Sequence, residues 1–186
     1  MLLFIDACIR GEESRTKALC EAFLAEYIKL NPSETIKRVE LAGGEFEPLT
    51  HHDLENTSDE RNKAAKKFAG ADKIIIGAPY WDFSFPAVLK CYIEHICLKD
   101  TAFRYCDDEG LVGLCKADKL LYICTAGGAI EGENHGFAYI KEVGSKLLGI
   151  KEFFYIDAQE LDIVGKDIKK IMSEAADKVV KAAGLF

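Results

Sequence analysis

The sequence lacks the excess of basic residues that is typical of nucleic-acid-binding domains. It has 24 Lys and Arg against 31 Asp and Glu, for a formal net charge of -7, and this composition argues against a nucleic-acid partner. Hydrophobic residues make up 49% of the chain, a globular share that excludes a disordered protein. A length of 186 residues fits one domain over residues 1–186. We therefore expect one folded domain with a small-molecule partner.

A membrane-spanning run and a targeting signal are both absent. Residues 1–6 are apolar, but they carry no basic head and no cleavage site, and the run ends at Asp6. Such a run is far too short to cross a bilayer. We expect no membrane span, and we expect residues 1–6 to form a buried first strand.

No CxxC pair occurs, so zinc-ribbon and iron–sulfur patterns are unsupported and we expect no metal site. The cysteines are odd in number and scattered, which is unlike a secreted disulfide framework. They favour reduced thiols in a cytoplasmic protein. The seven are Cys8, Cys20, Cys91, Cys97, Cys106, Cys115 and Cys124.

Short apolar runs alternate along the chain with segments of helical periodicity. The expected strands are 1–6, 35–41, 73–78, 119–125 and 152–157. The expected helices are 14–30, 59–69, 86–98, 137–148 and 168–183. The run 73–78 shows no polar alternation, which is typical of a parallel strand covered by helices on both faces.

Segments 103–106 and 111–114 flank Asp107-Asp108-Glu109-Gly110 and predict a hairpin inserted before the fourth strand of the sheet. The whole pattern predicts an α/β fold, a doubly wound five-stranded parallel sheet in the flavodoxin-like order 2-1-3-4-5. In this fold a ligand lies beyond the carboxyl ends of strands 1, 3 and 4. Three loops, 7–16, 79–86 and 125–136, should therefore carry the function.

The first loop ends in Ser14-Arg15-Thr16 at the start of a helix. Two hydroxyls, a guanidinium and the free N–H groups of a helix start suit an anionic phosphate. The alternative is that Ser14 only caps the helix and Arg15 is solvated. The loop has neither GxGxxG nor GxxxxGK[ST], which disfavours a Rossmann dinucleotide site and a nucleotide P-loop.

The second loop, 79–86, has four aromatic residues within six positions, directly after the central strand. This amount of aromatic surface at a strand end indicates a planar heteroaromatic ligand such as a flavin. We assign Tyr80 and Trp81 to the ligand. The alternative is packing under the following helix, which we expect for Phe83 or Phe85.

The third loop begins Thr125-Ala126-Gly127-Gly128-Ala129 after the fourth strand. Paired glycines permit close backbone approach and positive φ, and they leave N–H groups free to point at a carbonyl or an anionic ring nitrogen. A plain turn is the alternative.

These loops resemble those of the FMN-dependent NADH-azoreductases, part of the NAD(P)H-quinone oxidoreductase group with a flavodoxin-like fold. Residues 79–86 are similar to the family's Pro-Met-Tyr-Asn-Phe-x-x-Pro type motif, and Ser14-Arg15-Thr16 stand where the family has a Ser-x-Ser type element. Stretches 101–105 and 110–114 resemble the family's hairpin, and Gly127-Gly128 fall at its glycine pair. The resemblance covers nearly the whole chain.

The resemblance implies that FMN is bound, with Ser14 and Thr16 on its phosphate and Arg15 adjacent. The aromatic loop would line the isoalloxazine, and the glycine pair would lie beside it. The candidate cofactor-binding residues are Cys8, Ser14, Arg15, Thr16, Pro79, Tyr80, Trp81, Asp82, Phe83, Thr125, Ala126, Gly127 and Gly128.

Two residues depart from the family pattern. Cys8 stands where the family often has a serine, and a thiol is a poorer donor to phosphate. Asp82 stands where the family usually has an asparagine. A carboxylate near a reduced, anionic flavin would lower its reduction potential.

The implied activity is a ping-pong transfer of two electrons from NADH or NADPH, through FMN, to a quinone, an azo compound or a similar acceptor. Tyr105 and Tyr80 are the catalytic candidates, as hydrogen-bond or proton donors to the acceptor. The four histidines are expected to be structural or solvated.

The resemblance also implies a homodimer. Two alternatives stay open: a flavodoxin-type non-enzymatic electron carrier, and a flavin-free interaction domain with the same fold.

Overall fold

A computed structural model describes residues 1–108 and 110–186. Its centre is a five-stranded parallel sheet in the order β2-β1-β3-β6-β7. The strands are β1 (Leu2–Asp6), β2 (Ile36–Glu40), β3 (Lys73–Gly77), β6 (Lys119–Thr125) and β7 (Glu152–Ala158). Numbered within this sheet alone, the order is 2-1-3-4-5, which confirms the predicted topology.

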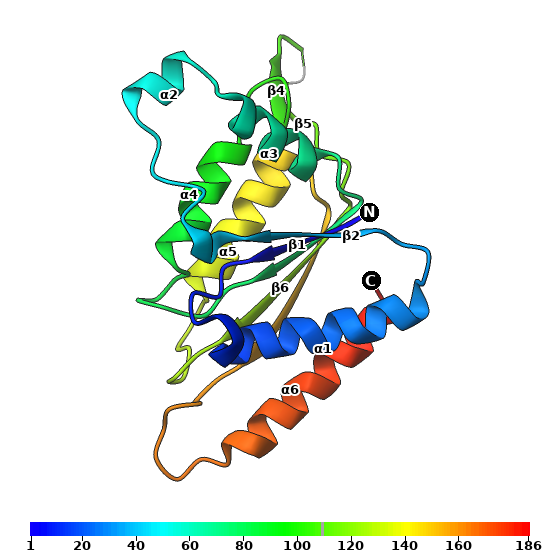
Figure 1. Cartoon of the computed structure of the whole chain (residues 1–186), viewed down its shortest axis with the longest axis vertical. Coiled ribbons are helices and arrows are strands. Elements are labelled where there is room, and N and C mark those ends of the chain that lie inside the picture. Colours follow the sequence, from blue (N-terminus) through cyan, green and yellow to red (C-terminus); the bar gives the residue numbers. More distant parts are fainter. Residues whose placement is uncertain (109) are drawn as a thin grey trace.

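Helices cover both faces of the sheet (Figure 1). On one face lie α1 (Arg15–Leu30) and α6 (Ile168–Ala183), and on the other lie α3 (Asp59–Ala69), α4 (Ala87–Ile96) and α5 (His135–Glu142). Successive strand residues alternate between the two cores: Phe4 packs on the α1 side, and Leu3 and Ile5 pack on the α3 side. Burial on both faces explains why the strands are continuous apolar runs.

The predicted hairpin is present. It consists of β4 (Phe103–Cys106) and β5 (Gly110–Gly113), which pair antiparallel with Phe103 opposite Gly113. The second strand begins one residue earlier than expected, and Glu109 of the predicted turn lies outside the described residues. Gly113 packs directly on the backbone of Leu148, where any side chain would overlap it. This contact fixes the hairpin to the sheet-covering layer.

One predicted helix changes from α-helical to π-helical geometry midway. The segment 137–148 begins as α5 and continues as a π-helical stretch, η3 (Val143–Leu148), which ends at Gly149 with φ of +85°. At Gly144 the ring of Phe153 approaches so closely that a Cβ would lie 2.7 Å from it. A widened helix at a glycine accommodates this ring.

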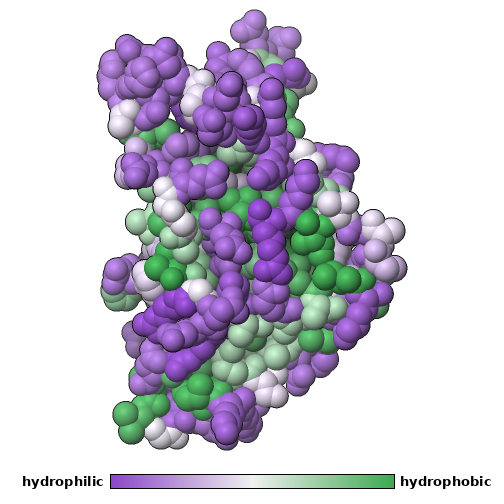
Figure 2. Space-filling view, viewed as in Figure 1, coloured by the Kyte–Doolittle hydropathy of each residue, from purple (hydrophilic) through white to green (hydrophobic). Residues whose placement is uncertain are grey.

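Three short helices were not predicted: η1 (Gly11–Glu13), η2 (Leu41–Gly43) and α2 (His51–Glu55). A capping box explains α2, since Thr50 and Asp53 each bond the other's backbone N–H. Figure 2 shows a mainly hydrophilic surface over the upper part of the molecule, where α2 and α3 lie in Figure 1. Among residues 1–108 and 110–186, no helix combines the length and apolar character needed to cross a membrane.

The carboxyl ends of β1, β3 and β6 meet at one edge of the sheet, at the left of Figure 1, where α1 begins. Hydrogen bonds of the sheet continue past the strands: Ala7 N–H donates to the Gly77 carbonyl (2.9 Å), and Ala78 N–H donates to the Ile123 carbonyl (3.0 Å). The three predicted loops therefore leave the sheet side by side.

Gly77, the last residue of β3, generates a test of this packing. A Cβ there would lie 2.5 Å from the Cys20 Sγ and 3.3 Å from the Phe4 ring. Gly77→Ala should lower the free energy of unfolding by about 1–3 kcal/mol because it overfills the core. Adding Cys20→Ala should recover part of that loss because it removes the opposing sulfur. Urea unfolding of both single variants and the double variant measures this coupling, and strictly additive losses would contradict it.

Candidate functional site

A cavity of about 500 Å³ opens where the predicted loops meet, within the usual size range of ligand sites, about 300–1,000 Å³. Every predicted cofactor-binding residue lines it except Cys8, Phe83 and Gly128. The lining residues are Ile9, Arg10, Glu13, Ser14, Arg15, Thr16, Pro79, Tyr80, Trp81, Asp82, Thr125, Ala126, Gly127, Leu161 and Asp162.

The start of α1 forms one wall. Ser14 is its N-cap and accepts a hydrogen bond from the N–H of Lys17 at 3.2 Å, so the predicted N-cap is confirmed. Within the described part of the chain, no hydrogen bond uses the N–H of Arg15 or Thr16. Free N–H groups at a helix start are suited to an anion. Capping and anion binding are therefore compatible here.

Thr16 is fully buried beneath this wall. Its hydroxyl lies 2.6 Å from the hydroxyl of Thr125 at the end of β6. One of the two hydroxyls must donate to the other, so the pair retains a single O–H proton for any further acceptor. This bond ties the first loop to the third.

The aromatic loop forms the second wall. Tyr80 N–H donates to the Thr125 carbonyl at 2.9 Å, and Trp81 and Ser84 exchange two backbone hydrogen bonds. Between them, Asp82 and Phe83 have φ of +49° and +65°, as in a type I′ turn. Asp adopts this left-handed region more readily than Phe.

The aromatic side chains of this loop divide between core and surface. Phe85 packs against Tyr139 of α5, with ring centroids 5.6 Å apart, so this ring joins the core as expected but contacts α5, and its packing under the following helix, α4, stays a prediction. Tyr80 is half-buried in the cavity wall. Phe83 is 76% exposed and forms a T-shaped pair with the Tyr80 ring, with centroids 6.5 Å apart.

The glycine loop forms the third wall. Neither Gly127 nor Gly128 has positive φ. Gly127 instead allows close approach, because a Cβ there would overlap the carboxylate of Asp162 where it now lies. No hydrogen bond among the described residues uses the N–H of either glycine, so both remain available to a ligand. Gly128 lies just outside the cavity lining.

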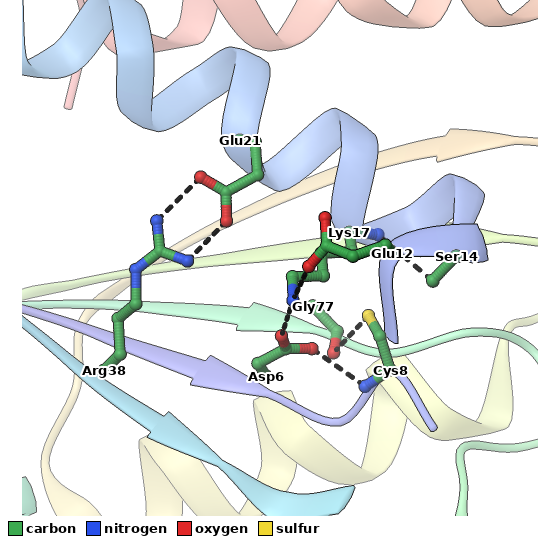
Figure 3. Close-up of polar contacts among 8 residues, drawn as sticks. All are labelled: Asp6, Cys8, Glu12, Ser14, Lys17, Glu21, Arg38 and Gly77. Atoms are coloured by element: carbon green, nitrogen blue, oxygen red, sulfur yellow. Dashed lines mark hydrogen bonds and ion pairs between the residues drawn. The ribbon is translucent and has the colours of Figure 1, made fainter. Parts of the chain in front are cut away.

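Cys8 lies behind the cavity wall and does not line it. Its Sγ faces the Gly77 carbonyl at 3.6 Å, and its N–H donates to Asp6 (Figure 3). Burial raises the pKa of the Cys8 thiol well above its ordinary value, with a smaller opposing effect of Ser14. Nearby, Lys17 bonds Glu12 at 2.7 Å, which raises the pKa of Lys17 and lowers that of Glu12. The predicted Cys8–phosphate contact remains a prediction.

Tyr105 is also outside the lining. It stands on β4, is 67% exposed, and contacts the Phe103 ring edge-on with centroids 5.8 Å apart. Its predicted role toward an acceptor remains a prediction. Within residues 1–108 and 110–186, no group of three or more His, Cys, Asp or Glu side chains is placed to hold a metal ion.

The sequence interpretation missed five lining residues: Ile9, Arg10, Glu13, Leu161 and Asp162. The first three lie in the predicted first loop, beside its assigned residues. Leu161 and Asp162 follow β7, the fifth strand of the sheet. Their signal in the sequence is their position beyond the carboxyl end of a sheet strand, since the flavodoxin-like prediction covers only the loops after strands 1, 3 and 4.

Comparisons with known proteins identify the family and the fold. A family model described as "Flavodoxin-like fold" matches residues 1–183. A curated protein of Clostridium acetobutylicum, "FMN-dependent NADH:quinone oxidoreductase 2", is 34% identical over 201 residues, covering 100% of this chain and 98% of its own. A Clostridium perfringens protein, "FMN-dependent NADH:quinone oxidoreductase", is 34% identical over 197 residues with the same coverage.

Solved structures share the fold. An FMN-dependent NADH-azoreductase from Bacillus anthracis, in complex with FMN, has a TM-score of 0.86 at 23% identity, covering 98% of this chain and 97% of its own. An NAD(P)H:quinone oxidoreductase from Methanothermobacter marburgensis has a TM-score of 0.77 at 18% identity, covering 98% and 97%.

The left-handed conformation of Phe83 generates a prediction. Phe83→Gly should raise the free energy of unfolding by about 1 kcal/mol, because glycine adopts positive φ without the steric penalty of a side chain. Phe83→Ala is the matched control: it removes the same exposed ring but keeps the Cβ, so it should bring no gain. Urea unfolding without added flavin compares them. Equal effects of the two variants would contradict a strained turn.

Proposed function

Because this chain belongs to the flavodoxin-like family of FMN-dependent NADH:quinone oxidoreductases, we propose that its cavity binds FMN and that it transfers electrons from NADH to quinone or azo acceptors. The enzyme is an oxidoreductase. One observation carries the site assignment: a helix start, an aromatic loop and a loop with free N–H groups enclose a single cavity.

The residues present fit FMN. Ser14, the Arg15 side chain and the unbonded N–H groups at the start of α1 suit a phosphate. Tyr80 and Trp81 provide aromatic surface for a flat ring. The unbonded N–H groups of Gly127 and Gly128 suit the polar edge of the ring, where negative charge develops on reduction.

FMN, when bound, supplies the hydride-accepting chemistry that protein side chains lack. The chain's own groups bind, orient and exclude water. The aromatic loop shields one side of the cavity from solvent, which strengthens the electrostatic effect of the glycine N–H groups. Tyr80, in the cavity wall, is proposed to donate a hydrogen bond to the acceptor.

We propose a ping-pong order. The helix start, the aromatic loop and the glycine loop wall the cavity on three sides, so the donor and the acceptor would use the same opening in turn. NADH is the proposed donor, and NADPH is tested beside it.

The test is steady-state oxidation of NADH and of NADPH with added FMN, with a benzoquinone and an azo dye as acceptors. We expect FMN-dependent turnover and parallel lines in double-reciprocal plots when both substrates are varied. Intersecting lines would contradict the ping-pong order. Failure to bind added FMN would contradict the proposed function itself, and FMN binding without turnover would instead indicate an electron carrier.

Asp82 lines the cavity and is exposed to solvent. We expect Asp82→Asn to raise the midpoint potential of the bound flavin by up to about 30 mV, because it removes a negative charge that disfavours the reduced ring. Asparagine also adopts positive φ, so the turn should be kept. Spectroelectrochemical titration measures the shift. An unchanged potential would contradict the placement of Asp82 beside the ring.

A homodimer is also proposed. Tyr105 and Leu111 of the hairpin are 67% and 38% exposed, and such apolar surface suits a symmetric contact. In this arrangement Tyr105 would reach a flavin site near the subunit interface. Light scattering of the purified protein gives the oligomeric state, and a monomer at all concentrations would contradict the proposal.

A further inference from the structure

We propose that Asp162 is a positioning residue that holds the Arg15 guanidinium for the flavin phosphate, and that this pair makes the cavity select phosphorylated flavin over riboflavin. The inference rests on the proposed function, since it assumes FMN in this cavity. It assigns roles to a loop after β7 that sequence interpretation did not include.

Arg15 is the first residue of α1, and its side chain crosses to the loop between β7 and α6. Its Nη1 donates to the Leu161 carbonyl at 3.1 Å and to the Asp162 Oδ1 at 2.8 Å. All three residues line the cavity. The guanidinium is thus held at two points beside the free N–H groups of the helix start.

The two hydrogen bonds of Nη1 leave another edge of the Arg15 guanidinium for a phosphate. A guanidinium has five N–H donors, and Nη1 carries two of them, which match its two acceptors. Among residues 1–108 and 110–186, no hydrogen bond uses the Nε or Nη2 of Arg15. These atoms form a fork of parallel donors, the edge that binds a phosphate through two oxygens.

Asp162 is itself held in place by the glycine loop. Its N–H donates to the Gly127 carbonyl at 2.8 Å, and Leu161 N–H donates to the Ala126 carbonyl at 3.1 Å. The missing side chain of Gly127 provides the space for the Asp162 carboxylate. The main chain of Asp162 is therefore held in place without a ligand, and its carboxylate orients Arg15 through their hydrogen bond.

The ion pair contributes little to folding, because its side chains are 42% and 67% exposed. We therefore expect its effect on the ratio of the affinities for two ligands, FMN and riboflavin. Riboflavin shares the ring and the ribityl chain of FMN and lacks only the phosphate. The ratio of the two affinities isolates the contribution of groups that contact the phosphate.

The experiment is a pair of fluorescence-quenching titrations, with FMN and with riboflavin, on the wild-type chain, Arg15→Ala, Asp162→Ala and the double variant. We expect Arg15→Ala to weaken FMN binding about tenfold, the loss of roughly one charge-assisted bond. Asp162→Ala should weaken FMN binding about threefold, a fraction of that loss, because Arg15 remains but is no longer held. Riboflavin binding should stay unchanged in all variants.

The double variant should bind FMN like Arg15→Ala alone, because Asp162 acts through Arg15. Glu160→Gln is the matched control: it removes a negative charge from the same loop, but Glu160 pairs with Lys166 at 2.7 Å and is not in the cavity lining. This variant should leave both affinities unchanged.

Three results would overturn the inference. Tighter FMN binding by Asp162→Ala would show that the carboxylate competes with the phosphate. Equal losses for FMN and riboflavin would show a general structural role, and additive losses in the double variant would show independent action. If the wild-type chain bound neither flavin, the proposed function would fail, and this inference with it.

Discussion

The candidate site depends on hydrogen bonds that continue the parallel sheet beyond its strands. Ala7 N–H donates to Gly77, Tyr80 N–H to Thr125 and Ala126 N–H to Ala158, each at 2.9 Å. A parallel sheet aligns its carboxyl ends at one edge, and these additional bonds carry the alignment into the loops. The loops are therefore held against each other by the same forces that hold the strands.

Several residues at this edge both stabilise the fold and line the cavity. Ser14 satisfies a helix N–H and lines the cavity, and the hydroxyl pair of Thr16 and Thr125 joins two walls in the buried interior. Asp82 has a left-handed conformation that closes a turn, and the same residue places a carboxylate in the cavity lining. Such overlap means that the site is largely preformed by the fold.

The sheet order, the hairpin and the three principal loops could be predicted because each has a local signal: apolar runs, helical periodicity and aromatic or glycine clusters. The conversion of α5 into η3 could not, because it depends on contact between Gly144 and Phe153, a residue of another element. Asp162 could not be assigned for a related reason. Its position after β7 marks the loop, but no local pattern marks the carboxylate itself, whose place depends on Gly127 and Arg15.

The burial of the thiols near the cavity has a chemical consequence. Quinones are electrophiles that add to thiolates, and a thiol reacts with them in proportion to its ionised fraction. Burial raises the pKa of Cys124 to about 12 and that of Cys8 further, and no cysteine is among the residues that line the cavity. A quinone that entered this cavity would therefore meet no thiolate in its lining.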